Sequence, residues 1–127
     1  MIDKKTILFV PTLKYLSNHL FESFAHKLKQ KYRCVYFDPG LHNFQTADKD
    51  SQIKVDTNIF DDVFFCDRQE KIVNNLWRDL INFYSHARKI KKYIDQINPS
   101  VVITPSDSSF FIKVLDRFYP GIEVVII

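Results

Sequence analysis

The chain has 127 residues, of which 46% are hydrophobic and 26% are charged, and its formal net charge is +3. The length suits one domain with one core, and the balance of residues excludes a disordered or membrane-spanning chain. A net charge this small does not indicate a nucleic-acid partner, and we expect none.

The first half of the chain predicts two strands with a helix between them. Thr6–Val10 is a short apolar run ended by Pro11, which is typical of a buried strand. Ser17 is the expected N-cap of the following helix. Cys34–Phe37 predicts the second strand. The helix has one apolar stripe, made of Leu16, Leu20, Phe24 and Leu28 with Phe21, Ala25 and Tyr32 beside them.

The second half predicts three more strands and at least two helices. A third strand is expected in the weakly patterned stretch from Leu41 to Asp67, which contains the apolar pair Ile59-Phe60 and the apolar triplet Val63-Phe64-Phe65. Helical spacing over about 68–98 fits one long helix, or two with a break near Ser85 and His86. Val101–Ile103 predicts an interior strand. Ser106 or Asp107 caps a helix that ends before Gly121, and Ile122–Ile127 predicts a fifth strand.

Alternation of strands with helices predicts an α/β fold: a Rossmann-like, doubly wound parallel sheet of about five strands in the order 3-2-1-4-5, with helices on both faces. We expect residues 1–127 to form a single domain. The apolar fifth strand needs a further helix to cover it, so we expect the chain to be the N-terminal half of a longer two-domain protein.

Several common sites are excluded by what the sequence lacks. Cys34 and Cys66 have no spacing typical of a disulfide framework or a zinc site, so we expect both to be reduced. The sequence has no G-x-G-x-x-G and no Walker A motif. Asp38 is therefore interpreted as a turn residue before Pro39, not as a ribose-binding acid. We expect no cofactor and no metal.

Two polar loops, one after the first strand and one after the fourth, are the best candidates for a site. In the predicted strand order they meet where the order reverses, which is where open α/β sheets bind ligands. His19 lies in the first helical turn, whose dipole favours a neutral imidazole that can act as a general base. Asp107 on the facing loop is the candidate that would orient it. His19 as an exposed first-turn residue is the alternative.

Hydroxyl groups beside the free N–H groups of a helix N-terminus suit a phosphate or a sugar hydroxyl. Lys14 would suit an anionic acceptor, and simple capping is the alternative role for the serines. The residues that we assign to substrate binding are Thr12, Lys14, Ser17, Asn18, Thr104, Ser106 and Ser108.

Other candidates have simpler interpretations. His26 and His86 are expected to be surface or packing residues, and His42 has no partner in view. Trp77 lies on an apolar helical stripe and is expected to pack in the core. One basic cluster is either a solvated helix face or a patch that faces anionic lipid or a phosphorylated substrate; it consists of Arg88, Lys89, Lys91 and Lys92.

The chain resembles the N-terminal domain of GT-B fold glycosyltransferases and of the related UDP-N-acetylglucosamine 2-epimerases. The resemblance rests on Ile7–Thr12 leading to His19 and a helix, and on Asn98–Asp107. It implies an acceptor-binding half for a cell-surface polysaccharide or lipid-linked acceptor, inactive without a C-terminal domain that holds the nucleotide sugar. No targeting segment is visible, and Ile7–Val10 is far shorter than a membrane helix, so we expect a cytoplasmic location, with peripheral contact to the inner face of the membrane as an alternative.

A second hypothesis stays open beside this one. The chain would then be a stand-alone, non-catalytic α/β module whose two loops bind a small anionic or sugar ligand. The same doubly wound sheet serves unrelated functions, so the fold alone does not separate the two hypotheses.

Overall fold

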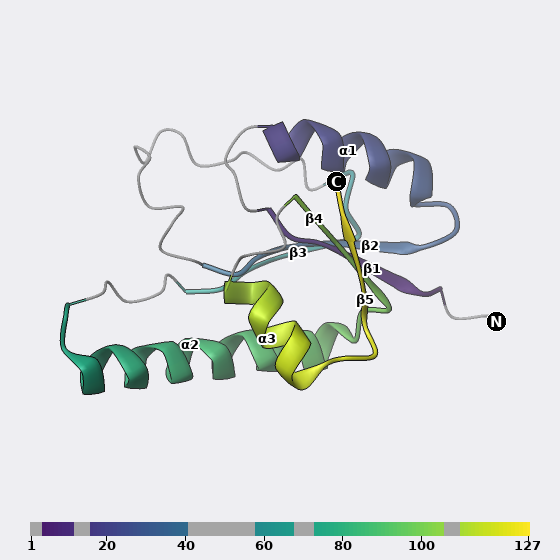
Figure 1. Cartoon of the computed structure of the whole chain (residues 1–127). Coiled ribbons are helices and arrows are strands. Elements are labelled where there is room, and N and C mark those ends of the chain that lie inside the picture. The colour runs from purple at the N-terminus through teal and green to yellow at the C-terminus, as the bar shows by residue number, and fades with distance from the viewer. Residues whose placement is uncertain (1–3, 12–15, 41–57, 68–72, 106–109) are drawn as a thin grey trace.

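A five-stranded parallel sheet forms the centre of the protein (Figure 1). The computed structural model describes residues 4–11, 16–40, 58–67, 73–105 and 110–127. Strand order is β3-β2-β1-β4-β5, and every neighbouring pair is parallel, which confirms the predicted doubly wound sheet. The described elements are β1 (Thr6–Phe9), α1 (Leu16–Leu28), β2 (Arg33–Asp38), β3 (Asp62–Phe65), α2 (Leu76–Ile97), β4 (Val101–Thr104), α3 (Phe110–Phe118) and β5 (Glu123–Ile126).

The sheet is buried on both faces by helices. Leu8 on β1 lies between Val35 on β2 and Val102 on β4, and this row packs against α2 and α3. Phe9, the next residue, points to the opposite face because side chains alternate along a strand. There it packs edge-on against Phe21 of α1, with ring centroids 5.4 Å apart. These two layers explain why the central strands are apolar on both faces.

Helix α1 differs from its prediction at its start and in its buried face. It begins at Leu16, so Ser17 lies within the first turn and does not cap the helix. Phe21 and Ala25 are fully buried, but the predicted stripe residues Leu20 and Phe24 are exposed. The side of α1 that packs on the sheet is therefore the one that carries Phe21 and Ala25, next to the predicted stripe and not centred on it.

Helix α2 is one continuous helix, without a break at Ser85 and His86. It begins at Leu76 and not near Arg68, because the Asn75 side chain accepts a hydrogen bond from the Arg78 N–H at 3.1 Å and caps it. It ends at Ile97, followed by Asn98 in the left-handed conformation, whose N–H donates to the Ile94 carbonyl at 2.8 Å.

The first half of α2 extends beyond the sheet (Figure 1). The buried residues of this helix begin only at His86, which contacts Pro39 just past the end of β2. Residues 76–85 therefore project past this edge, over about 15 Å of helix. The prediction that Trp77 packs in the core is wrong, because its side chain is 75% exposed on this projecting part. The periodicity of apolar residues shows that a helix has an apolar side, but it does not show which part of that side packs against the sheet.

Strand β5 forms one edge of the sheet. Its Val124 packs against the core below α2 and α3, whereas Val125 and Ile126 are exposed. The expectation of a further covering helix, and of a longer two-domain protein, stays a prediction. Within the described part of the chain, no helix combines the length and hydropathy that crossing a membrane requires.

Candidate functional site

The point where the strand order reverses lies between β1 and β4, as the sequence predicted. Phe9 pairs with Ile103, and the Val10 N–H donates to the Ile103 carbonyl at 2.9 Å, which extends the pairing beyond β1. The chain leaves both strands here, through Pro11 and Thr104. This is the carboxyl edge at which open α/β sheets bind ligands.

Thr104, a predicted substrate-binding residue, is the described side chain that stands out at this edge. It is fully buried, and its Oγ1 has no hydrogen-bond partner. Its backbone carbonyl is satisfied by the Ile127 N–H at 3.1 Å, so the hydroxyl alone is left over. A buried hydroxyl without a partner costs about 1–3 kcal/mol, and such groups are rare in folded proteins. Thr104 ends β4, so this hydroxyl lies at the carboxyl edge of the sheet.

Most other predicted site residues lie outside the described structure. This applies to Thr12 and Lys14 after β1, and to Ser106, Asp107 and Ser108 after β4. The structure therefore does not test the predicted pairing of His19 with Asp107, nor the choice of cap for α3.

The first turn of α1 carries the remaining predicted site residues. The backbone places Ser17, Asn18 and His19 in this turn, directly after the loop from β1. Their side chains lie outside the described part of the structure. The position of His19 in the sequence of elements is thus as predicted, and its role stays a prediction.

The turn after β2 is held by side-chain and backbone hydrogen bonds. Asp38 accepts from the Gly40 N–H at 2.9 Å through its carboxylate, and its carbonyl accepts from the Cys66 N–H at 2.9 Å. Gly40 has a φ of 71°, and a Cβ there would collide with the Asp67 carbonyl oxygen. Asp38 is thus a turn residue before Pro39, as the sequence analysis interpreted it.

His86 makes a long-range contact that the sequence did not predict. It is buried, and its Nε2 donates to the Pro39 carbonyl oxygen at 2.6 Å. Burial lowers its pKa, although the hydrogen bond to Pro39 opposes that shift, so the ring is neutral with its proton on Nε2. The spacing of His86 with Ile90 and Ile94 could have revealed its burial, but a contact across 47 residues has no local signal. Its role is structural, because it docks α2 on the edge of the sheet.

The cysteines are poor nucleophiles. Both thiols are free and buried, and desolvation raises the pKa of Cys34 and of Cys66 to about 11. Cys66 faces a hollow of about 270 Å³ at the carboxyl end of β3. Lys89 and Lys92 of α2 line the same hollow, and the Lys89 ammonium lies 3.8 Å from the Asp67 carboxylate. This hollow therefore contains the Lys89–Asp67 ion pair and the Lys92 ammonium, and no reactive thiolate.

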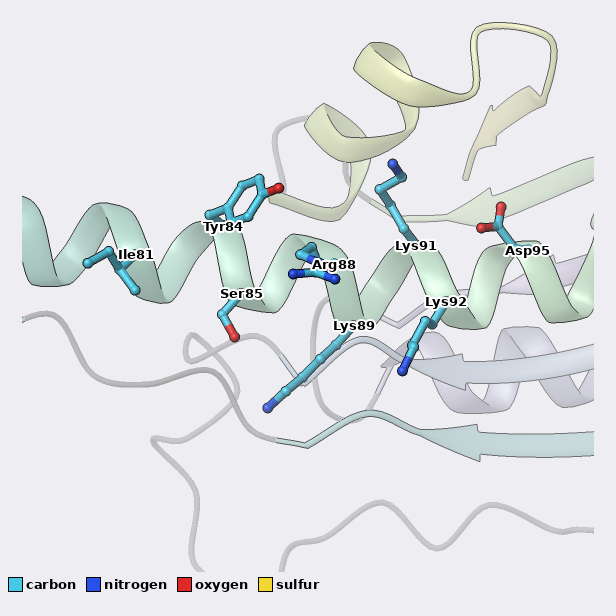
Figure 2. A pocket seen from close by; sticks show the side chains of 8 residues that line it. All are labelled: Ile81, Tyr84, Ser85, Arg88, Lys89, Lys91, Lys92 and Asp95. Carbon is cyan, nitrogen blue, oxygen red and sulfur yellow. The ribbon is translucent and has the colours of Figure 1, made fainter.

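A second hollow of about 540 Å³ runs along the outer face of α2 (Figure 2). In Figure 2 Lys91 points toward α3, whereas Lys89 and Lys92 extend to the other side of the helix. No group of metal-ligating side chains occurs among the residues that the structure describes. The hollow is lined by Ile81, Tyr84, Ser85, Arg88, Lys89, Lys91, Lys92 and Asp95.

Comparison with known proteins supports the fold alone. No protein-family model and no curated protein matches this chain. Among solved structures, the C-terminal domain (residues 78–226) of a hydrogenase from Pyrococcus furiosus is similar with a TM-score of 0.53 and 9% sequence identity. The match covers 98% of this chain and 92% of that chain. At this identity the similarity carries no information about activity.

Proposed function

We propose that this chain is the acceptor-binding domain of a glycosyltransferase that transfers a sugar from a nucleotide-sugar donor to a cell-surface polysaccharide or lipid-linked acceptor. The observation that carries the proposal is the buried Thr104 hydroxyl without a partner, at the reversal point of the strand order. A sugar hydroxyl both donates and accepts hydrogen bonds, so it can satisfy this group. The resemblance to GT-B acceptor domains rests on the sequence around the same two strands.

In the proposed reaction, this domain binds the acceptor and removes its proton. His19, in the first turn of α1, takes the proton from an acceptor hydroxyl, and Asp107 orients the imidazole. The acceptor oxygen then forms a bond to the anomeric carbon of the donor sugar, and the bond to the nucleotide leaving group breaks. A second domain holds the donor, so this domain alone is inactive.

Binding of sugar by the isolated 127-residue chain is the first test. Oligosaccharides are screened on an array, and the strongest binder is titrated into ¹⁵N-labelled protein. The proposal expects perturbed amide signals at the ends of β1 and β4, and about tenfold weaker binding by Thr104→Val, which loses one hydrogen bond. Thr6→Val is the matched control, because Thr6 is buried at the opposite end of β1. Equal loss of binding in both variants contradicts the proposal.

Turnover by the full-length protein tests the chemical role. His19→Ala is expected to lower turnover by at least about 100-fold, the usual contribution of a general base, with donor affinity unchanged. His26→Ala is the control, since His26 is an exposed histidine on the same helix. Unchanged turnover in His19→Ala removes this residue from the mechanism.

A non-catalytic module that binds a small anion is the second candidate. The hollow beside β3 favours it, because Lys89 and Lys92 line a space of about 270 Å³. Inorganic phosphate titrated into labelled protein separates the candidates. Shifts at Cys66 and Tyr93, with no binder on the sugar array, favour the module; shifts at the ends of β1 and β4 with sugar favour the transferase domain.

A further inference from the structure

The projecting half of α2 carries an uncovered hydrophobic face. Five large side chains there are each more than half exposed: Leu76, Trp77, Leu80, Ile81 and Tyr84. A contiguous exposed apolar patch on a folded protein usually marks a surface that binds a partner or a membrane.

Positive charge follows directly on the same side of the helix. Residues three and four apart are neighbours on a helix surface, so Tyr84 leads to Arg88, and Arg88 leads to Lys91 and Lys92. Figure 2 shows that Lys91 and Lys92 lie on the two flanks of this face, with Lys91 directed toward α3 and Lys92 to the other side.

Among the residues that line the hollow on this face of α2, four basic side chains face one carboxylate. Asp95 is the carboxylate on this face, and it accepts a hydrogen bond from the Tyr119 hydroxyl at 2.5 Å. The Lys91 ammonium lies 4.2 Å from the centroid of the Phe118 ring, on α3, which adds another exposed aromatic side chain beside the helix. The outer face of α2 is thus hydrophobic in its first half and basic in its second.

This combination fits a bilayer better than a protein or a nucleic acid. Amphipathic helices that lie on membranes bury Leu, Ile and Trp among the acyl chains, while Lys and Arg contact anionic headgroups. Trp and Tyr favour this interface. A nucleic acid would leave the aliphatic side chains in water. A second copy packed fully antiparallel would set the basic half of α2 on the apolar half of its partner, and buried unpaired charges are costly.

We propose that the outer face of α2 docks this protein on a membrane surface that contains anionic lipids. Trp77, Leu80 and Ile81 enter the interface, and Arg88, Lys91 and Lys92 bind the headgroups. The inference does not rest on the proposed function, because it needs neither a sugar nor the loops after β1 and β4.

Trp77 is the reporter of choice, since it is the single tryptophan of the chain and belongs to the exposed hydrophobic half of α2. The emission of the 127-residue chain is recorded with phosphatidylcholine vesicles and with vesicles of equal phosphatidylglycerol and phosphatidylcholine. We expect a blue shift and co-sedimentation with the mixed vesicles only, both weakened by salt. No binding to mixed vesicles, or equal binding to both kinds, overturns the proposal.

Two double variants with the same change in net charge show whether vesicle binding depends on this face of α2 or on the net charge of the protein. Arg88→Glu with Lys92→Glu is expected to lower partitioning into mixed vesicles by roughly 30-fold or more, because each basic residue near an anionic surface contributes about 1 kcal/mol, which is about a fivefold factor. Lys27→Glu with Lys31→Glu makes the same change in charge at exposed positions of α1 and just after it, on the other side of the sheet. Equal loss in the two double variants overturns the proposal.

The hydrophobic half has its own test. Leu80→Ser with Ile81→Ser removes exposed side chains and keeps Trp77 and every charge. Co-sedimentation of this variant is expected to fall by at least tenfold, with its near-ultraviolet circular dichroism unchanged. A blue shift of Trp77 that grows with protein concentration in the absence of lipid would identify a second copy as the occupant and overturn the proposal.

Discussion

Replacing Thr104 by valine is expected to stabilise the protein. Valine has nearly the shape of threonine and lacks the hydroxyl whose Oγ1 is buried without a partner. Leaving such a group unsatisfied costs about 1–3 kcal/mol, so the variant should gain about 1–2 kcal/mol in the free energy of unfolding. For a chain of this size each kcal/mol corresponds to about 4 °C in Tm.

Urea unfolding followed by Trp77 fluorescence and by circular dichroism measures this gain. With a slope of about 2 kcal/mol/M, the midpoint should rise by about 0.5–1 M without a change in slope. Val102→Thr is the matched reverse change, because Val102 is fully buried two residues earlier on the same strand. Its new hydroxyl should lower the free energy of unfolding by about 1–3 kcal/mol.

The opposite result for Thr104→Val would refute the reasoning. If this variant and Val102→Thr both unfold at lower urea, the Thr104 hydroxyl has a partner in solution and is not held free for a ligand. A gain in stability joined to a loss of sugar binding is the expected pattern for a group kept for function at a cost in stability.

Three further predictions concern the turn after β2, the buried histidine and the thiols. Gly40→Ala should destabilise the protein by at least about 2 kcal/mol in urea because of its φ of 71° and the collision at its Cβ, whereas Gly121→Ala, with nothing within 4 Å, should be neutral. Burial lowers the pKa of His86 in the folded state below its unfolded value of 6.5, so the unfolded state binds more protons as the pH falls. The free energy of unfolding should therefore decrease as the pH drops below about 6.5. His86→Gln keeps an N–H donor and should remove this part of the pH dependence. Since the pKa of Cys34 and of Cys66 is raised to about 11, both thiols should react with Ellman's reagent at least about 100-fold more slowly in native than in unfolded protein, and a fast native phase would contradict the buried positions.

The strands and their order were predictable because their signals are local and their topology has few solutions. Thr6–Phe9 and Val101–Thr104 are apolar runs bounded by Pro or polar residues, as interior parallel strands require. Helical segments between them force parallel pairing with crossovers of one hand, which leaves few strand orders. The order 3-2-1-4-5 follows from that reasoning, and the structure confirms it.

The buried faces of the helices were not predictable in the same way. A strand of four residues spans about 13 Å, whereas the 22 residues of α2 span about 33 Å, so the sheet covers only part of the helix. The same apolar spacing continues from the buried Ile90 and Ile94 to the exposed Leu80 and Leu76. Periodicity does not show where along α2 the contact with the sheet ends. His86, which contacts the distant turn after β2, marks the position where that contact begins.

The two proposed surfaces lie toward the same end of the molecule, and this leads to a last prediction. Helix α2 projects beyond the carboxyl edge of the sheet (Figure 1), and Thr104 ends β4 at that edge. An acceptor at Thr104 would therefore lie at the end of the molecule toward which a membrane-bound α2 projects. Because the surfaces use different residues, Thr104→Val should leave vesicle binding unchanged. Arg88→Glu with Lys92→Glu should leave the affinity for a water-soluble oligosaccharide unchanged and weaken capture of the same sugar on a lipid anchor. Loss of soluble-sugar binding in the charge-reversed variant would mean that α2 is part of the sugar site, and the assignment of two separate surfaces would then be wrong.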